Sequence, residues 1–467
     1  MIWRCAYTIF AQSVEKNANV LYNIAMDVFD TENSVVSQED LHDGIDFVSE
    51  FSLELQQYKN RITGSESETA CARAIRSRLA EETGATVRLE AYRAYPLLGR
   101  GSLPFFGLWY LLCYVLYFVS FAGPRIAGIL IALLALAVYA VGAGAMLTMY
   151  LGKHKLKGIL SQKISYNVVS EFSKNKDKLN KERVIVIADN HDATLGNFVT
   201  DYKFMSKLAH VLVPLTSIVF VLFCILKMAI GADTPAKITA FSVIPAVIGV
   251  IGISVTVLRF SPFERNAKQN NGVATAVAMA TYAYFAEQPD ILPDDVRIVY
   301  TSLGGENSAH GGSEAFVKAH PEFQGAKVLC LQDIENGNFK IAEMNAMRKI
   351  QYSTPLVSVI RSGAHEQKIE ITTLPHDSIP QKISSIHGYI SDEFALNGLE
   401  SATILSAESD AYGRELDIND LEKLFSITVG TVLKLIKESP APSQEVKDQP
   451  AQNVTSEKME IHSVSGK

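Results

Sequence analysis

Two long hydrophobic stretches, each broken once near its middle, interrupt an otherwise polar sequence of 467 residues. The first covers residues 104–151 with a break at Gly123-Pro124-Arg125, and the second covers about 209–258 with a break at 231–235. Each half holds about 20 nearly uncharged residues, enough for a helix to cross a ~30 Å hydrocarbon core. A helix in a soluble core rarely runs this long without a polar face. The pattern therefore predicts two transmembrane helical hairpins and an integral membrane protein with four spans.

The basic residues that flank these stretches indicate on which side of the membrane the polar sequence lies. Because each hairpin leaves the polar sequence and returns to it, all of that sequence lies on one side. The flanking Lys and Arg residues on that side are Arg93, Arg100, Lys153, Lys155, Lys157, Lys203, Lys207 and Arg259, and those on the far side are Arg125, Lys227 and Lys237. Lys and Arg near span ends resist translocation. We therefore expect the soluble domain to be cytoplasmic.

The amino-acid composition limits the partners and the cysteine chemistry that we expect of this chain. The net charge of −7 is mixed in sign and contains no basic block, so we expect no nucleic-acid partner. The five cysteines are scattered, and two lie inside the predicted spans, so they indicate packing rather than a disulfide or zinc framework. The expected organisation is an N-terminal segment (1–36), a soluble domain in three parts (37–103, 152–208 and 259–437), two hairpins (104–151 and 209–258) and a disordered tail (438–467).

The soluble parts alternate between helical and extended patterns. Ser65, followed by Glu68 in a capping box, predicts a helix that ends at Gly84, and further helices are expected at 37–58 and 272–285. The expected strands are 86–91, 164–172, 183–188, 296–303, 327–331, 356–360 and 402–405. Strands that alternate with helices predict an α/β domain, a mostly parallel sheet with helices on both faces.

Polar residues follow three of these strands at the point where each strand ends. They are Asp189-Asn190-His191-Asp192, Gly304-Gly305-Glu306-Asn307 and Gln332-Asp333. Sites in parallel sheets form where the carboxyl ends of strands meet their loops. The three segments therefore predict one polar crevice.

Two short motifs in the soluble parts resemble a known superfamily. Arg61-Ile62-Thr63-Gly64-Ser65 resembles the Arg-x-x-Gly-Ser segment before the first helix of the zinc-dependent aminopeptidase superfamily, which includes glutamate carboxypeptidase-like proteins, glutaminyl cyclases and the transferrin receptor ectodomain. Asn167-Val168-Val169 resembles the Asn-Val strand before that family's first metal ligand. The resemblance covers 37–438 outside the hairpins and implies a zinc-aminopeptidase-like fold.

The resemblance also implies a two-zinc site in which most ligands are replaced. Members hold the metals with a His, a bridging Asp, a Glu, an Asp and a second His, and a Glu general base activates metal-bound water. Asp333 alone matches a ligand, Glu306 matches the general base, and Asp192 matches the carboxylate that orients the first ligand. The other four ligand positions hold Asn190, Lys268, Asn307 and Ser406. Because Lys at the bridging position repels a divalent ion, we expect no bound cofactor.

Three functions remain open from the sequence. The first is a pseudoenzyme: a catalytically degenerate membrane protein whose peptidase-like domain acts as a binding or scaffold module, with the lipid bilayer and other membrane proteins or peptides as partners. The second is an active membrane-tethered metallopeptidase with a rearranged zinc site, in which His191 and His310 join Asp192, Glu306 and Asp333. The third is a transport component, which is disfavoured because no charged residue lies well inside a span.

The position of the second hairpin adds one expectation. It is inserted between Asp192 and Lys268, two positions of the predicted site. Its helix ends should lie near the edge of the sheet that carries the site, so that this edge faces the membrane.

Overall fold

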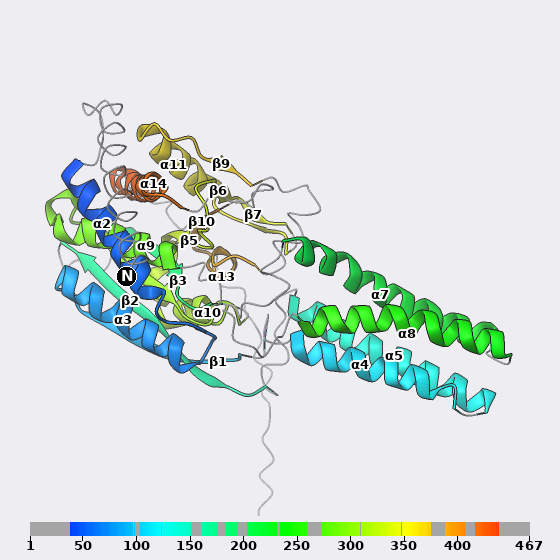
Figure 1. Cartoon of the computed structure of the whole chain (residues 1–467). Coiled ribbons are helices and arrows are strands. Elements are labelled where there is room, and N and C mark those ends of the chain that lie inside the picture. The colour runs from blue at the N-terminus through cyan, green and yellow to red at the C-terminus, as the bar shows by residue number, and fades with distance from the viewer. Residues whose placement is uncertain are drawn as a thin grey trace, which may run out of the picture.

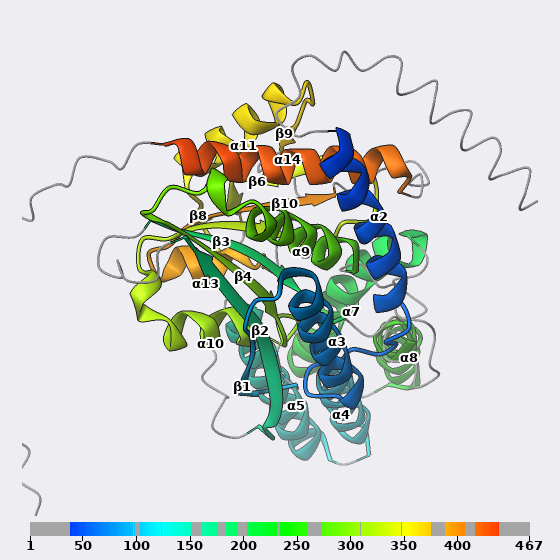
Figure 2. The same cartoon turned by 90° about the vertical axis from the view of Figure 1, so that its left-hand side faces the viewer.

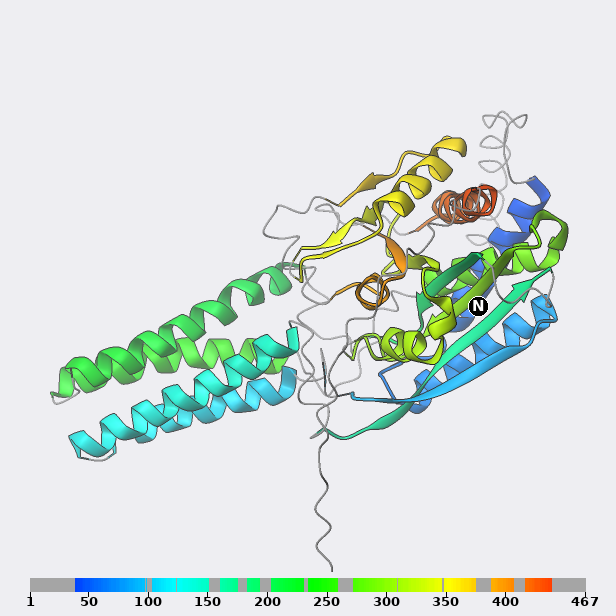
Figure 3. The same cartoon turned by 180° about the vertical axis from the view of Figure 1, so that it is seen from behind.

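A computed structural model describes the central part of the chain: residues 38–96, 98, 103–122, 124–150, 160–174, 183–193, 203–230, 234–258, 272–308, 310–346, 348–374, 388–406 and 416–438. The N-terminal segment, Lys268 and residues 439–467 of the tail lie outside the described residues. Figures 1 and 3 show an α/β part from which long helices project side by side.

The α/β part is built on an eight-stranded sheet in the order β1-β2-β4-β3-β5-β10-β6-β9. Its strands are β1 (Val87–Ala94), β2 (Lys163–Ser173), β3 (Arg183–Asn190), β4 (Val296–Leu303), β5 (Lys327–Leu331), β6 (Phe339–Ala342), β9 (Thr372–Thr373) and β10 (Glu400–Ser406), and β7 (Met344–Asn345) pairs separately with β8 (Ile350–Gln351). The four central strands are parallel, but β1, β2 and β6 run antiparallel to their inner neighbours. The predicted mostly parallel sheet is therefore a mixed sheet with a parallel centre.

Helices cover both faces of this sheet (Figure 2). They are α2 (Gln38–Leu55), α3 (Glu66–Thr83), α9 (Gly272–Glu287), α11 (Thr354–Glu366) and α14 (Ile418–Lys437) on one face, and α10 (Gly311–Ala319) and α13 (Ser391–Leu396) on the other, with short 3₁₀ turns η3 (Pro289–Ile291) and η4 (Pro321–Phe323). Along β3, Ile185 and Ile187 pack on the first face, whereas Val186 and Ala188 pack on the second. This alternation is expected of a strand buried on both sides.

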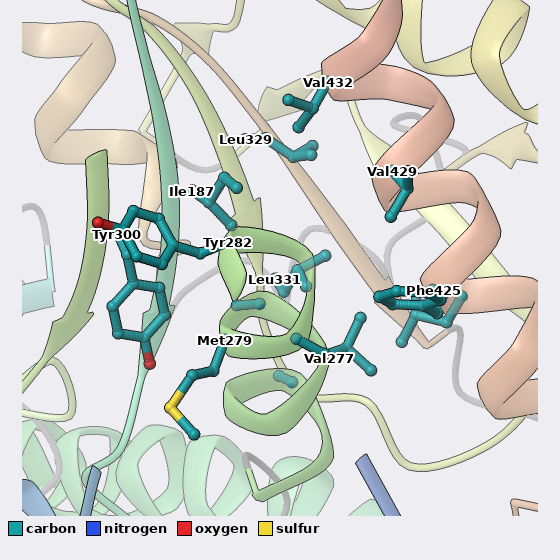
Figure 4. Close-up of a cluster of buried hydrophobic side chains, with 14 of the residues drawn as sticks. Ile187, Val277, Met279, Tyr282, Tyr300, Leu329, Leu331, Phe425, Val429 and Val432 are labelled. Carbon is teal, nitrogen blue, oxygen red and sulfur yellow. The ribbon is translucent and has the colours of Figure 1, made fainter. Parts of the chain in front are cut away.

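The larger core lies under α9 and α14. Figure 4 shows Val277 and Met279 of α9 and Phe425 of α14 around Ile187 and Leu329 of the sheet. The predicted small residues of α9 are almost all buried, which lets this helix lie close to the strands. The cysteines at 71, 113, 224 and 330 are unpaired and buried, as expected of packing residues.

Helix α3 begins and ends where the sequence predicts. The Ser65 hydroxyl accepts the Glu68 backbone N–H at 3.1 Å, and Gly84 adopts the left-handed conformation with φ of 61°. The predicted capping box is incomplete, because the Glu68 side chain accepts the N–H of Gly64 rather than that of Ser65. The Glu68 side chain therefore does not complete the cap of its own helix.

The strand predicted at 356–360 is wrong, because these residues lie within α11. Ser353 caps this helix by accepting the Leu356 N–H at 3.3 Å, and Pro355 occupies its first turn. The buried positions Leu356, Val357, Ile360, Gly363 and Ala364 follow the helical spacing of three and four. A short apolar run cannot by itself separate a buried strand from the buried face of a helix.

The projecting helices form two antiparallel hairpins packed into one bundle (Figures 1 and 3). Helices α4 (Leu103–Val119) and α5 (Arg125–Tyr150) form the first, and α7 (Lys203–Ile230) and α8 (Pro235–Leu258) form the second. The interior of the bundle is aromatic, with Tyr114, Tyr117 and Phe220 buried at its centre. The Tyr117 hydroxyl donates to the Phe241 carbonyl of α8 at 2.6 Å and so joins the two hairpins.

The bundle carries most of the exposed apolar side chains of the described residues. Of 26 large hydrophobic side chains classed as exposed, 21 lie on these four helices. Among the helices that the structure describes, one segment, Arg125–Ala145, is long and apolar enough to cross a membrane. The apolar parts of the other three helices are each 10–17 residues long, so four full spans are not confirmed.

Both hairpins leave the α/β part from the same edge of the sheet. We call this the carboxyl edge, where β3, β4, β5 and β10 end. Because β2 runs antiparallel to β4, its first residue, Lys163, lies at this edge, and Ala94 pairs with it. The second hairpin follows the end of β3 and precedes α9, whose Thr275 contacts Asp189 of β3. The ends of both hairpins therefore meet at one edge.

Candidate functional site

The predicted strand-end residues gather at the carboxyl edge. Asn190 is in register with Leu303, so the segments after β3 and β4 start at the same level. The backbone N–H of Ser406 donates to the Asp333 carbonyl at 3.3 Å and joins the ends of β10 and β5. The end of β10 thus joins the three strand ends at which the sequence predicts a site.

The loop after β4, residues 304–313, is held by three buried carboxylates. The backbone N–H of Gly305 donates to Glu68 at 3.0 Å, that of Asn307 to Asp192 at 2.8 Å, and that of Ser313 to Glu306 at 2.5 Å. Asn167 adds an amide clamp, since it accepts the Gly304 N–H at 3.1 Å and donates to the Gly312 carbonyl at 2.9 Å. The conformation of the loop therefore depends on acceptors from α3, from β2, from the segment after β3 and from the loop itself.

Glu68, one of the acids around this loop, is almost fully buried, with 1% of its surface accessible. Besides Gly305 it accepts the Gly64 N–H at 2.5 Å and the Ser165 hydroxyl at 2.7 Å. Burial, and then the charge of Asp192, raise the pKa of Glu68 to about 8 against the opposing effect of these hydrogen bonds. A carboxyl group tuned to this range can gain or lose a proton near neutral pH.

The side chain of Asn190 forms a hydrogen bond with the carboxylate of Asp192. The Asn190 amide donates to Asp192 Oδ1 at 3.0 Å, while Asp192 Oδ2 receives the Asn307 N–H. Burial raises the pKa of Asp192 to about 6, and the two hydrogen bonds oppose that rise. Both oxygens of this carboxylate are thus engaged by the protein itself.

Glu306 and His310 form a buried pair one helical turn apart. Glu306 Oε2 lies 3.1 Å from His310 Nδ1, and the Ser313 hydroxyl donates to the same oxygen at 3.2 Å. Burial alone would lower the pKa of His310, but the hydrogen bond and charge of Glu306, with the charge of Asp392, raise it overall. The contact with Glu306 therefore favours the protonated form of His310.

His191 points into the protein rather than toward Glu306. Its Nδ1 lies 3.1 Å from the Ser302 hydroxyl, and burial, followed by the positive charge of Arg61, lowers its pKa to about 3. The rearranged site that joins His191 to His310 is therefore not assembled here. No cluster of three or more His, Cys, Asp or Glu side chains suited to a metal ion occurs in the described part of the chain.

Two further predicted ligand positions, Asp333 and Ser406, lie just after β5 and at the end of β10. Asp333 has a left-handed backbone with φ of 50°, and its carboxylate accepts from the Gln332 amide at 3.3 Å. The Ser406 hydroxyl donates to the Asn336 carbonyl at 2.6 Å and accepts the N–H groups of Glu335 and Asn336. Ser406 thus stabilises a loop where the family pattern has a ligand.

Sequence reasoning missed two residues of this site. The sequence indicates only a helix-capping role for Glu68. Its contacts with Ser165 and Gly305 are not part of that pattern. Asn167 was recognised only as part of a family motif, and its role as a clamp on Gly304 and Gly312 depends on contacts far along the chain. No local pattern contains either contact.

No protein-family model matches the sequence, and no curated protein matches it. Solved structures do resemble this chain. They include a zinc aminopeptidase from Bacillus subtilis (9% identity, TM-score 0.45, 87% of this chain and 96% of that chain), the LapA aminopeptidase of Legionella pneumophila (8%, 0.44, 87% and 77%) and a glutaminyl cyclase from Porphyromonas gingivalis (10%, 0.41, 84% and 98%). The chain is therefore similar to zinc aminopeptidases and a glutaminyl cyclase at identities and TM-scores that assign neither a family nor an activity.

Proposed function

We propose that this chain is a membrane protein of four spans whose cytoplasmic, peptidase-like domain is a binding or scaffold module rather than a peptidase. One observation carries the degenerate site: the carboxylates of Asp192 and Glu306 already accept hydrogen bonds from the loop that they hold. Metal-assisted hydrolysis uses one such carboxylate to orient a ligand and the other to take a proton from metal-bound water, whereas here both hold the loop. Within this proposal, we also expect that the domain binds no cofactor.

The surface of the bundle supports the membrane assignment. Leu, Ile and Val side chains cover its exterior, while tyrosine hydroxyls turn inward and find backbone acceptors. In water this arrangement would expose a large apolar surface, which soluble monomers avoid. A hydrocarbon environment accommodates it, because each polar group must then be satisfied inside the protein.

The carboxyl edge is the expected binding surface. Both hairpins leave the sheet there, so the loops that carry Asn307 and Asp333 would lie next to the bilayer. Partners that fit this position are peptides or other membrane proteins that approach along the membrane surface.

Membrane association can be tested by extraction. Membranes from cells that express the full chain should retain it after alkaline carbonate treatment, and release into the supernatant would contradict a spanning bundle. Topology can be read from single cysteines at Thr234, on the turn between α7 and α8, and at Leu396, which is 57% exposed on α13. An impermeant maleimide should label Thr234→Cys on intact cells and Leu396→Cys only after permeabilisation, and the reverse order would overturn the cytoplasmic assignment.

The degenerate site can be tested on purified protein. We expect less than one equivalent of zinc and no hydrolysis of aminoacyl substrates. Stoichiometric zinc, with peptidase activity lost in Glu306→Gln but kept in the control Glu314→Gln, would establish the active metallopeptidase instead.

Binding at the carboxyl edge needs its own experiment. A photoreactive amino acid at Asn307 should crosslink to peptides or membrane proteins in native membranes. The same probe at Leu53, which is 62% exposed on α2, serves as the control. Equal crosslinking from both positions would contradict the proposed surface.

A further inference from the structure

A second polar cluster lies inside the α/β part, next to the candidate site but separate from the loop 304–313. It consists of Arg61, Asp189, His191 and Ser302, and we call it the inner cluster. Arg61 comes from the loop before α3, and the other three come from the ends of β3 and β4. All four are buried, and Arg61 is 0% exposed.

The groups of the inner cluster are only partly satisfied. The Arg61 guanidinium donates to the Cys71 sulfur at 3.5 Å through Nη1, but its Nε and Nη2 have no hydrogen-bond partner among the described residues. Asp189 Oδ2 and His191 Nε2 are also buried without a hydrogen bond of good geometry there, and the Tyr300 hydroxyl, unpaired in the same way, interacts with the Asp189 carboxylate and lowers its pKa. A buried cation or carboxylate without partners costs several kcal/mol, so such groups normally contact each other or water.

The hydrogen bonds that are made fix which free atoms donate and which accept. Asp189 Oδ1 accepts the hydroxyls of Ser302 at 2.6 Å and Thr275 at 2.7 Å. Because the Ser302 proton goes to the carboxylate, its oxygen accepts from His191 Nδ1–H at 3.1 Å. The burial that lowers the His191 pKa keeps this ring neutral, so Nε2 carries a lone pair.

The four free atoms thus need a molecule that both accepts and donates. Arg61 Nε and Nη2 carry three N–H donors between them, whereas Asp189 Oδ2 and His191 Nε2 are two acceptors. An anion would be repelled by Asp189, and a cation would be repelled by Arg61. A water molecule both accepts and donates hydrogen bonds, so one or a few waters can serve these donors and acceptors.

We propose that the inner cluster is a binding site for one or a few internal water molecules, which bridge the Arg61 guanidinium to Asp189 and His191. The bridged guanidinium neutralises the Asp189 carboxylate without a direct ion pair. Since the Arg61 carbonyl also accepts the Ala193 N–H at 2.8 Å, the hydrated cluster joins the loop before α3 to the segment that carries Asp192. This proposal does not depend on the proposed function.

A structure of the full chain at a resolution that shows ordered water provides the direct test. We expect water density within hydrogen-bonding distance of Arg61 and of Asp189 or His191. A dry cluster, or a guanidinium that contacts the Asp189 carboxylate directly, would overturn the proposal.

A double-mutant cycle on the full chain tests the coupling. Arg61→Met and Asp189→Asn should each lower the melting temperature by several degrees, and the double variant should lose clearly less than the sum, because neither charge is then left alone. The matched cycle of Arg78→Met and Glu82→Gln, a more exposed pair on α3, should show little coupling. Additive losses at Arg61 and Asp189 would overturn the bridge, and if Arg61→Met fails to fold, the water density in the native chain decides.

Discussion

The Glu68 carboxylate accepts the backbone N–H of Gly305 at 3.0 Å, across 237 positions of the sequence. The same side chain receives the N–H of Gly64 and the hydroxyl of Ser165. One carboxyl group therefore connects the loop before α3, strand β2 and the loop after β4. This contact explains why the loop 304–313 keeps its position although it contains four glycines.

Replacing Glu68 should change how stability depends on pH. Its pKa is raised from 4.5 to about 8, so its contribution to folding is complete below pH 4.5 and is lost as pH rises through 8. Glu68→Gln loses the acceptor for the Gly64 N–H and should be less stable than the native chain at pH 6, by about 1–3 kcal/mol. The difference should narrow or reverse by pH 9, as measured by thermal unfolding in detergent. A difference that stays constant between these values would contradict a titrating Glu68.

Alanine variants of Gly305 and Gly325 should distinguish the cost of backbone strain from the cost of steric overlap. Both have left-handed φ values, 58° and 79°, but a methyl group at Gly305 would overlap the Tyr92 hydroxyl, whereas the space around Gly325 is open. We expect Gly325→Ala to cost about 1 kcal/mol from backbone conformation alone. Gly305→Ala should cost clearly more, because it also displaces the Tyr92 hydroxyl from its hydrogen bond to the Gly304 carbonyl. Denaturant unfolding of both variants gives the comparison, and equal losses would mean that Tyr92 moves freely.

His320 should make the outer strand pair sensitive to pH. Its Nε2 lies 3.0 Å from Glu90 of β1, and its Nδ1 lies 2.9 Å from Glu322. Burial opposes protonation, but both carboxylates raise the His320 pKa overall, so its stabilisation is complete below pH 6.5 and is lost as pH rises through the raised value. His320→Gln should cost about 1 kcal/mol near pH 6 and less near pH 9, measured by thermal unfolding. The exposed His365→Gln serves as the control and should show no such trend.

An arginine on the outer surface of the bundle tests whether that surface contacts lipid. Leu134, 52% exposed near the middle of α5, faces outward. In a bilayer, Leu134→Arg should disfavour insertion by about 2.5–3.5 kcal/mol and reduce the membrane-bound fraction. Leu53→Arg, at an equally exposed position on α2, should leave that fraction unchanged. If both variants reach the membrane equally, the surface around Leu134 does not face hydrocarbon.

The sequence predicted those features that depend on local pattern. Ser65 and Gly84 bound α3 as expected, because a cap is formed within a few residues of the chain. The apolar run at Leu356–Ile360 led to a wrong prediction of a strand, because burial alone does not distinguish a strand from one face of a helix. Ser353 and Pro355, a capping residue and a first-turn proline, carried the signal that would have corrected it.

The candidate site was predictable in place but not in its contacts. Parallel strands bring Asn190, Glu306 and Asp333 to one edge, and this follows from their positions after strands. The carboxylates of Asp192 and Glu306 accept hydrogen bonds from the backbone of the loop 304–313. The sequence could not predict these contacts, because they depend on side-chain geometry. The direction of His191 likewise depends on Ser302, which lies 111 positions away in the sequence.

The pairing of Ala94 with Lys163 has a practical consequence for the first hairpin. Directly opposed residues in antiparallel strands are about 4.5–5.5 Å apart, a gap that a two-residue turn closes. The 68 residues between them are therefore a cassette inserted at the tip of a β-hairpin, and the β1–β2 ladder does not need them to close.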